Sequence, residues 1–304
     1  MLTFHGCLGI LTRFMEDIAE QKFVLTTQHH VPLRGDIRWN KRLADSGHKR
    51  LPVILVCHGF KAFKDWGPFP EIGRAFARNG FVSIVFNFSH NGIGEEPRKF
   101  VEHEKFAVNT FSLEIDDITT VLDAVVNGGF RLPFLDKRNI FLIGHSRGGA
   151  VSIIAGKEDE RVRGVAAWST ISRFNRYTDE QKLRWREKGH IQLHSVSEQK
   201  LFRISTALLD DIENNAERLN ILKNAEQLGK PFLIVHGTAD IPAKIEEAEQ
   251  IYAVSDKRWT EFVRLEGAGH MYGAKHPYRE ASPVLEHVID VTTYWIQQHL
   301  LLEE

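Results

Sequence analysis

Short apolar runs that alternate with segments of helical spacing constrain the fold of this chain more than any other feature. The run LPVILVC at 51–57 is continuous and rich in β-branched residues, which is typical of a strand covered on both faces. Similar patterns predict strands at 23–27, 32–39, 81–88, 140–143, 162–168, 231–237 and 260–265, and helices at 71–79, 112–126, 149–156, 243–253 and 283–300. Because strands that alternate with helices form right-handed crossovers, we expect an α/β protein with a mostly parallel, doubly wound sheet of eight strands.

Residues 171–230 interrupt this alternation. The segment is polar, helical in character and carries the mixed charge run RYTDEQKLRWREKGH. Its length exceeds that of an ordinary connection between strands of one sheet. We therefore expect a helical cap inserted at about 171–230 in a single domain of 21–304, which follows an N-terminal extension at 1–20. A solvated helical excursion with no role at a site is the alternative for most of these residues.

The charge balance excludes several classes of partner. The 304 residues include 39 Lys and Arg against 40 Asp and Glu, so no overall basic field attracts nucleic acid or anionic lipid. No apolar run approaches the roughly 18 residues that a membrane-spanning helix needs. We expect neither a nucleic acid nor a membrane as partner, and a homodimer stays open.

The N-terminal stretch MLTFHGCLGILTRF is apolar, but no positive region precedes it and no small-residue cleavage site follows it. A signal peptide is therefore a poor fit. A start at Met15 instead of Met1 would remove the stretch, and both starts stay open. The two cysteines, Cys7 and Cys57, are interpreted as reduced thiols rather than a disulfide. Together these features predict a cytoplasmic location.

The stretch FLIGHSRGGA at 141–150 ends an apolar run in a serine flanked by glycines. A strand followed at once by a tight turn and a helix, with the pattern G-x-S-x-G, is typical of a nucleophile elbow. The glycines are needed because the strained turn leaves no space for neighbouring side chains. Ser146 is therefore the candidate nucleophile, and an ordinary turn with a capping serine is the alternative.

A serine hydroxyl becomes a nucleophile only beside a base, and the base needs an orienting carboxylate. LIVHGTADIP puts Asp240 just after the predicted strand at 231–237, and RLEGAGHMYG puts His270 just after the strand at 260–265. Both lie at carboxyl ends of strands, the same end of the sheet as Ser146. These residues predict a Ser-His-Asp catalytic triad.

The other histidines have other interpretations. His276 remains an alternative base, whereas His145 and His236 are interpreted as packing residues. His190 and His194 have a helical i, i+4 spacing that can hold Zn²⁺, but no third ligand completes the set, so no metal is expected. No glycine-rich nucleotide loop follows a strand, so no cofactor is expected either.

Acyl transfer also requires backbone N–H donors for the oxyanion, each worth about 3 kcal/mol of transition-state stabilisation. One donor follows the nucleophile and belongs to Arg147. The second is expected in the loop CHGFKAFKDWGPF after the strand at 51–57. The backbone N–H of Phe60 is the candidate and that of Lys61 the runner-up, and a plain glycine turn is the alternative.

The motifs HGF, GHSRGG, HGTAD and GAGH, in this order over about residues 50–300, resemble those of the α/β-hydrolase superfamily. Within it the sequence is similar to the bacterial branch of dienelactone hydrolases, cinnamoyl-type esterases and prolyl oligopeptidase-like esterases. The resemblance implies the α/β-hydrolase fold and ester hydrolysis through an acyl-enzyme, with Ser146 as nucleophile, His270 as general acid and base, and Asp240 as its orienting group. Dienelactone hydrolases usually carry a cysteine nucleophile, so the serine argues against that particular activity.

Aromatic residues gather near the predicted oxyanion loop and in the cap. We assign Phe63, Trp66 and Trp185 to an apolar substrate pocket, with core packing as the alternative. The cations Lys61, Lys64 and Arg173 are candidates for contact with an anionic substrate group, and solvation is their alternative role.

The expected function is hydrolysis of a small or medium carboxylic ester by a serine esterase. One alternative is a ligand-binding protein that keeps the fold without catalysis, because fold does not imply function. Another is a perhydrolase or a carbon–carbon bond hydrolase that uses the same triad. The intact Ser146, His270 and Asp240 favour an enzyme, because a binding protein has no need of an activated serine.

Overall fold

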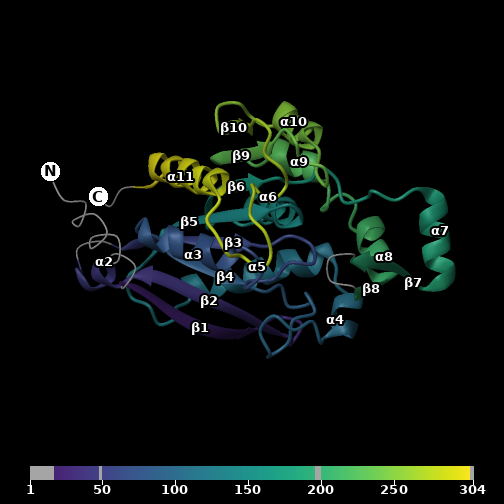
Figure 1. Ribbon diagram of the computed structural model, residues 1–304, viewed down its shortest axis with the longest axis horizontal. Helices are drawn as coiled ribbons and strands as arrows, with labels where there is room; N and C mark the ends of the chain where they lie inside the picture. Colours follow the sequence, from purple (N-terminus) through teal and green to yellow (C-terminus); the bar gives the residue numbers. More distant parts are fainter. Residues whose placement is uncertain (1–16, 48–49, 196–199, 302–304) are drawn as a thin grey trace.

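An eight-stranded sheet forms the centre of the computed structural model, which describes residues 17–47, 50–195 and 200–301 (Figure 1). The strands are β1 (Ile18–Thr26), β2 (Pro32–Asn40), β3 (Leu51–Cys57), β4 (Val82–Phe86), β5 (Leu135–His145), β6 (Val162–Trp168), β9 (Phe232–Gly237) and β10 (Thr260–Leu265). Their order across the sheet is β1-β2-β4-β3-β5-β6-β9-β10. β2 is antiparallel to both β1 and β4, and all other neighbours are parallel. The mostly parallel sheet of eight strands is confirmed.

Helices cover both faces of this sheet. On one face lie α3 (Phe69–Arg78) and α11 (Pro283–Gln298), and on the other lie α5 (Phe111–Val126), α6 (Arg147–Glu158) and α10 (Ile245–Val254). In β3, Val53 and Leu55 belong to one apolar core, whereas Ile54 and Val56 belong to the other. Successive side chains of a strand point to opposite faces, so a strand between two helical layers needs a continuous apolar run.

Most element boundaries lie close to the predicted ones. The strands predicted at 51–57, 162–168 and 260–265 match β3, β6 and β10. β1 begins at Ile18, so the last residues of the predicted N-terminal extension belong to the sheet, and Met1, Cys7 and Met15 lie outside the described residues. Two short helices, α2 (Lys41–Asp45) and α4 (His103–Ala107), were not predicted. Among the described helices, none has the length and apolar character to cross a membrane.

The segment between β6 and β9 is not purely helical. It contains α7 (Asp179–Lys188), an antiparallel pair of β7 (His190–Ser195) and β8 (Lys200–Ser205), α8 (Ala207–Asn214) and α9 (Ile221–Glu226). The prediction of a helical cap was wrong for β7 and β8. Ile191 pairs with Ile204 and Leu193 with Phe202, and this alternation of apolar residues is a strand signal that the neighbouring charge run hid.

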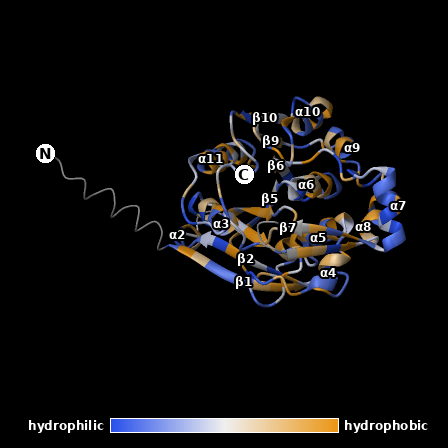
Figure 2. Cartoon of the chain, turned by 45° about the vertical axis from the view of Figure 1, so that its right-hand side comes forward, coloured by the Kyte–Doolittle hydropathy of each residue, from blue (hydrophilic) through white to orange (hydrophobic). Residues whose placement is uncertain are grey.

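The segment between β6 and β9 has two parts with different surroundings. α7, β7, β8 and α8 project from one end of the main body (Figure 1), and the surface of α7 is predominantly hydrophilic (Figure 2). α9 instead packs against α6 and α10 and so belongs to the helical layer of the main body. We call α7, β7, β8 and α8 the cap.

A carboxylate on α8 fastens the cap to the main body. Asp211 accepts hydrogen bonds from the backbone N–H groups of Phe111 and Ser112, at 3.0 and 3.1 Å, and from the Ser112 hydroxyl at 2.5 Å. These N–H groups belong to the first turn of α5, where they have no partner within the helix and where the helix dipole favours negative charge. Because Asp211 is buried, this contact joins α8 to α5 without competition from water.

Replacing Asp211 with alanine is expected to lower the free energy of unfolding by about 1–3 kcal/mol, because buried N–H groups lose their acceptor. Urea unfolding followed by circular dichroism measures this loss, and limited proteolysis measures loosening of the cap. The matched control is Asp210→Ala, which removes an exposed carboxylate paired with Arg186 and should cost less than about 1 kcal/mol. Equal losses in the two variants would contradict the role given to Asp211.

Candidate active site

The turn between β5 and α6 holds Ser146 in a strained conformation. Its backbone has φ 57° and ψ −122°, a combination that residues with side chains rarely adopt. The backbone N–H of Ser146 donates to Trp168 O at 2.8 Å, and the Thr170 hydroxyl donates to Ser146 O at 3.1 Å. Ser146 is partly exposed while the residues on either side of it are buried. The predicted strand, tight turn and helix are present, and the turn presents the serine to solvent.

Glycines make this turn possible. A Cβ atom on Gly144 would lie 2.2 Å from the carbonyl oxygen of Gly148, and one on Gly148 would lie 2.3 Å from the carbonyl oxygen of Cys57. Both distances are far below van der Waals contact. The turn therefore packs directly on the end of β3, where the predicted oxyanion loop begins.

His270 and Asp240 form a hydrogen-bonded pair. Nδ1 of His270 lies 2.8 Å from Oδ2 and 3.0 Å from Oδ1 of Asp240, and the backbone N–H of Ala243 donates to the same carboxylate at 3.0 Å. Burial alone would raise the pKa of the Asp240 carboxyl, but the hydrogen bonds from His270 and Ala243 outweigh it and hold the pKa below its usual value. The carboxylate is therefore ionised at neutral pH, and it fixes the His270 tautomer with the proton on Nδ1 and a lone pair on Nε2.

Two buried histidines support this pair. Nε2 of His145 donates to the backbone carbonyl of His270 at 2.8 Å, and the two rings lie 4.7 Å apart. Nε2 of His236 donates to Ala243 O at 2.7 Å and lies 3.4 Å from the Asp240 carboxylate. Burial lowers the pKa of His145 to about 3 and lowers that of His236 as well, so both rings are neutral at pH 7. The packing roles predicted for them agree with these contacts.

The alternative base, His276, lies in a different environment. Its Nδ1 accepts a hydrogen bond from the backbone N–H of Gly67 at 2.8 Å, and its ring stacks on Trp66 with centroids 5.2 Å apart. The structure therefore brings His270, and not His276, into a hydrogen bond with Asp240.

The loop after β3 runs beside the serine. A Cβ atom on Gly59 would lie 3.1 Å from Cβ of Ser146, so the two segments are in contact. Within the described part of the chain, the backbone N–H groups of Phe60 and Arg147 donate to no protein acceptor. Amides without a protein partner at this edge of the sheet are what an oxyanion site requires. The roles of Ser146 and of these amides in catalysis remain predictions.

A neutral histidine holds this loop in place. Nδ1 of His58 donates to Gly59 O at 2.9 Å, and Nε2 accepts from the backbone N–H of Phe88 at 3.3 Å. Burial lowers the pKa of His58 to about 4, so Nε2 keeps its acceptor lone pair at neutral pH.

Further along the loop, Lys64 is buried and pairs with Asp36 at 2.8 Å. Lys64 is therefore bound within the protein and does not meet a substrate anion.

A buried ion pair next to Ser146 in the chain, between Arg147 and Glu114, was not predicted from the sequence. Nε of Arg147 lies 2.8 Å from Oε2 of Glu114, and the Asn109 amide donates to Oε1 of the same carboxylate at 2.9 Å. The guanidinium lies over the rings of Phe60, at 5.3 Å, and Phe111, at 4.4 Å. The signal was a glutamate on the apolar face of the segment 112–126, where an isolated carboxylate is costly to bury.

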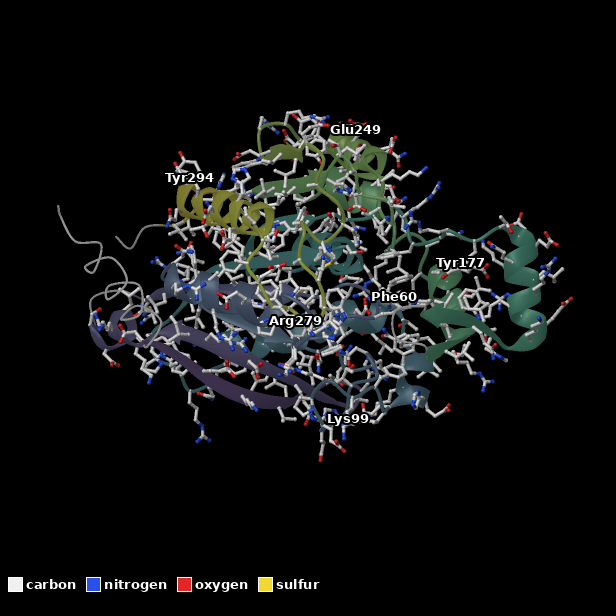
Figure 3. All side chains as sticks on the ribbon, in the orientation of Figure 1. Phe60, Lys99, Tyr177, Glu249, Arg279 and Tyr294 are labelled. Atoms are coloured by element: carbon white, nitrogen blue, oxygen red, sulfur yellow. The ribbon has the colours of Figure 1, made fainter. Side chains whose placement is uncertain are left out.

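The predicted substrate aromatics are distributed over different environments. Phe63 is buried beside His276, with ring centroids 6.0 Å apart. Trp185 is fully buried within the cap, and its Nε1 donates to Ile204 O at 3.2 Å. Trp185 thus forms the core of the cap, the alternative that the sequence analysis left open. Figure 3 places Phe60 between the main body and Tyr177 at the base of the cap.

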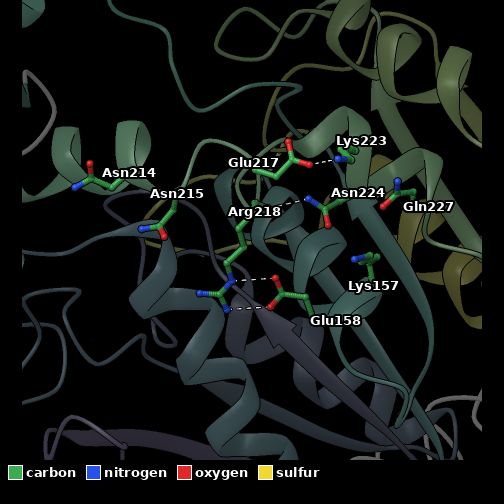
Figure 4. Close-up of a pocket in the computed structure, with 9 residues that line it drawn as sticks. All are labelled: Lys157, Glu158, Asn214, Asn215, Glu217, Arg218, Lys223, Asn224 and Gln227. Atoms are coloured by element: carbon green, nitrogen blue, oxygen red, sulfur yellow. Dashed lines mark hydrogen bonds and ion pairs between the residues drawn. The ribbon is translucent and has the colours of Figure 1, made fainter.

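A polar depression beside α6 lies away from this site. It has a volume of about 470 Å³ and is lined by residues of α6, α8 and α9 (Figure 4). Arg218 makes two hydrogen bonds of 2.9 Å to Glu158, and Lys223 pairs with Glu217. Because α6 has 12 residues and Glu158 is its last, this depression lies about 18 Å along the helix from Ser146. Its paired side chains indicate a structural role.

The metal interpretation fails on the observed geometry. His190 and His194 lie in β7, not on a helix, so their helical spacing has no meaning. Across residues 17–47, 50–195 and 200–301, no group of three His, Cys, Asp or Glu residues is arranged to hold a metal ion.

The sheet order and the serine turn define an α/β-hydrolase fold. The model of the family described as serine aminopeptidase, S33 matches residues 48–217, so the chain belongs to this family. The uncharacterized peptidase YuxL of Bacillus subtilis (strain 168) is 25% identical over 276 residues, which are 86% of this chain and 37% of that protein. The monoglyceride lipase of Mus musculus is 30% identical over 106 residues, 35% of this chain and 30% of the lipase. The chain thus aligns with about a third of the length of these relatives.

A solved structure supports the fold assignment. The dienelactone hydrolase from Anabaena variabilis ATCC 29413 superposes with a TM-score of 0.61 over 94% of this chain and 100% of that chain, at 13% identity. At this identity the likeness shows the α/β-hydrolase fold alone.

Replacing Glu114 with alanine is expected to lower the free energy of unfolding by about 3–5 kcal/mol, because it leaves the Arg147 guanidinium buried without a counterion. Urea unfolding measures the loss. Asp123→Ala on the same helix is the matched control, because Asp123 is half exposed and pairs with Arg161 at the surface, so about 1 kcal/mol or less is expected. A Glu114→Ala variant as stable as the control would show that the buried pair contributes little.

Proposed function

We propose that the chain is a serine hydrolase that cleaves a small or medium carboxylic ester through an acyl-enzyme intermediate. The observation that carries the proposal is the His270–Asp240 pair, whose shortest contact is 2.8 Å, at the same end of the sheet as the strained Ser146. In this arrangement His270 keeps a lone pair on Nε2 that can accept a proton from a nucleophile.

The proposed reaction proceeds in two stages. Ser146 Oγ attacks the ester carbonyl while His270 Nε2 takes its proton, and the ionised Asp240 stabilises the imidazolium that forms. The amides of Phe60 and Arg147 donate to the oxyanion. His270 then returns the proton to the departing alcohol, and a water molecule activated by His270 hydrolyses the acyl-enzyme.

Ester hydrolysis is supported by the likeness to a protein named monoglyceride lipase, and peptide hydrolysis is the second candidate because of the likeness to a protein named as a peptidase. The two are separated by comparing turnover of an ester and of the amide with the same acyl group. An ester is chemically more labile than the corresponding amide. A ratio of ester to amide turnover that exceeds this chemical difference would support the first candidate.

A fluorophosphonate probe is expected to label the wild-type protein and to leave Ser146→Ala unlabelled. The Ser146→Ala variant should also lose nearly all hydrolysis of para-nitrophenyl esters while its circular dichroism spectrum is unchanged. Ser152→Ala, which removes a buried hydroxyl from α6, is the matched control and should be labelled like the wild type. Labelling or full turnover by a folded Ser146→Ala variant would refute the assignment, and an unlabelled wild type would favour the ligand-binding alternative.

Asp240→Asn is expected to lower kcat by about four orders of magnitude if the carboxylate holds the His270 tautomer as in serine proteases. Asp256→Asn is the control, because this carboxylate pairs with Arg258 at the surface. Steady-state kinetics on one para-nitrophenyl ester compares the variants. A small effect of Asp240→Asn would argue that another group orients the base.

A further inference from the structure

The side chain of Arg147 joins the start of α6 to α5 and to the loop after β3. Its Nε lies 2.8 Å from Oε2 of Glu114 on α5. Its guanidinium carbon lies 4.4 Å from the ring centroid of Phe111, the first residue of α5, and 5.3 Å from that of Phe60. Because Phe60 belongs to the proposed oxyanion loop, the last contact links that loop to the residue after Ser146. We call Arg147, Glu114, Phe111 and Phe60 the arginine cluster.

Aromatic rings help to place this guanidinium. Arg147 is 7% exposed, and Glu114, its partner, is 4% exposed. The Nη2 atom of Arg147 is buried, and no group in the described part of the chain forms a hydrogen bond with it. The rings of Phe60 and Phe111 both lie within the roughly 6 Å over which a cation is attracted to an aromatic face. A planar guanidinium stacks on such faces, which a lysine ammonium cannot do. These contacts therefore use the shape of the arginine side chain as well as its charge.

The groups that hold the guanidinium are themselves anchored. Oε1 of Glu114 accepts a hydrogen bond of 2.9 Å from the Asn109 amide, which sets the direction of the carboxylate. Phe111 stacks on Phe174 with ring centroids 3.7 Å apart, and its backbone N–H donates to Asp211. A buried ion pair adds little stability over apolar residues of similar size, because desolvation of both charges offsets their attraction. Stability alone therefore does not account for the arginine cluster.

The Phe60 ring has a different environment from the rest of the arginine cluster. Phe60 is 36% exposed, so burial in the core does not fix its position. Its ring stacks on Phe106 at 5.8 Å, and the Lys61 ammonium lies 5.5 Å from its centroid. The contact with Arg147 is the one of these three that ties the ring to the serine turn.

This side-chain contact lies one residue beyond a backbone contact between the same two segments. Gly59 approaches the serine turn so closely that a Cβ atom on it would lie 3.1 Å from Cβ of Ser146. Two adjacent contacts fix both the distance between the segments and their relative rotation. Phe60 and Arg147 also carry the amides that are the proposed oxyanion donors, and two donors act together only where both point to one oxygen. A misplacement of about 1 Å in an active site can cost about a hundredfold in rate.

We propose that the Arg147 side chain is a positioning group for the oxyanion site. Held by Glu114, it fixes the Phe60 ring, and with the ring it fixes the direction of the Phe60 amide relative to the Arg147 amide. This inference rests on the proposed ester hydrolysis at Ser146. It gives the side chain of Arg147 an effect on the reaction rate that is separate from the backbone donor of the same residue.

The first test removes both charges together, because a single substitution would leave a buried charge unpaired. The variant is Arg147→Met with Glu114→Gln, in which the new amide oxygen still accepts from Asn109. Both stages of the proposed reaction form an oxyanion, so acylation and deacylation should slow together. We expect kcat for para-nitrophenyl butyrate to fall by about ten- to hundredfold while KM changes by less than about twofold.

The matched control makes the same two substitutions in an ion pair at the other end of α6. Arg218→Met with Glu158→Gln removes the pair that closes the polar depression, whose hydrogen bonds are 2.9 Å long. Its kcat should stay within about twofold of the wild-type value, because this partly exposed pair lies far from Ser146. Circular dichroism and urea unfolding establish that both double variants are folded.

Two ketones separate a positioning role from a general loss of structure. With a hexyl trifluoromethyl ketone, Ser146 Oγ forms a bond to the carbonyl carbon, its proton passes to His270, and the carbonyl oxygen becomes an oxyanion. Hexyl methyl ketone has the same chain and binds without this addition. In the Arg147 and Glu114 double variant, the inhibition constant of the trifluoromethyl ketone should rise by the factor by which kcat falls, and that of the methyl ketone by less than about twofold. Equal weakening of both ketones would overturn the proposal.

A second variant tests whether Arg147 acts through Phe60 and leaves the buried ion pair in place. Phe60→Leu keeps the backbone amide and removes the ring, so kcat should also fall by about ten- to hundredfold. Added to the Arg147 and Glu114 double variant, Phe60→Leu should deepen the loss by less than about twofold, because both changes break one contact. Losses that multiply would overturn the proposal, and so would a wild-type kcat in Phe60→Leu.

Failure of this inference is distinguishable from failure of the proposed function. Ser146-dependent hydrolysis by the wild type, with an unchanged kcat in the folded Arg147 and Glu114 double variant, overturns the positioning role and leaves the proposed function intact. Absence of Ser146-dependent hydrolysis of all para-nitrophenyl esters from acetate to octanoate overturns the proposed function and this inference with it.

Discussion

The close approach between the serine turn and the end of β3 is the contact on which the site depends. Gly148 lies so near the carbonyl oxygens of Cys57 and His58 that any side chain there would overlap them. This packing brings the start of α6 against the loop after β3, and it puts the amides of Phe60 and Arg147 on segments that touch. Because β3 and β5 are parallel neighbours, both segments leave the sheet at the same end.

Buried charge at this site is balanced over short distances. Asp240 is ionised and is surrounded by His270 and by His236, whose low pKa keeps it neutral at pH 7. On the other side of the serine, Glu114 neutralises Arg147, and burial raises the pKa of that glutamate. The proposed oxyanion donors, the backbone amides of Phe60 and Arg147, therefore lie in an environment with little net charge, where hydrogen-bond donors act most strongly.

The cap packs against α4 and α5 of the main body. Phe202 of β8 packs against Phe106 of α4, with ring centroids 5.1 Å apart, and Asp211 of α8 accepts hydrogen bonds from the start of α5, the helix that also carries Glu114. Phe111, the first residue of α5, stacks on Phe174 at 3.7 Å and lies under the Arg147 guanidinium. Contacts from Asp211 through Phe111 thus join the cap to Arg147, the residue after Ser146.

The sequence by itself determined the sheet and the positions of the candidate catalytic residues along the chain. Continuous apolar runs predicted β3 and β6, and glycine-rich turns at strand ends singled out Ser146, Asp240 and His270. The sequence did not predict the cap strands β7 and β8, the burial of Trp185, or the pairing of Arg147 with Glu114. Only the tertiary structure decided that His270 and not His276 meets Asp240. Periodicity and turn chemistry are local properties that neighbouring residues encode, whereas the partner of a buried polar group depends on which distant segments the fold brings together.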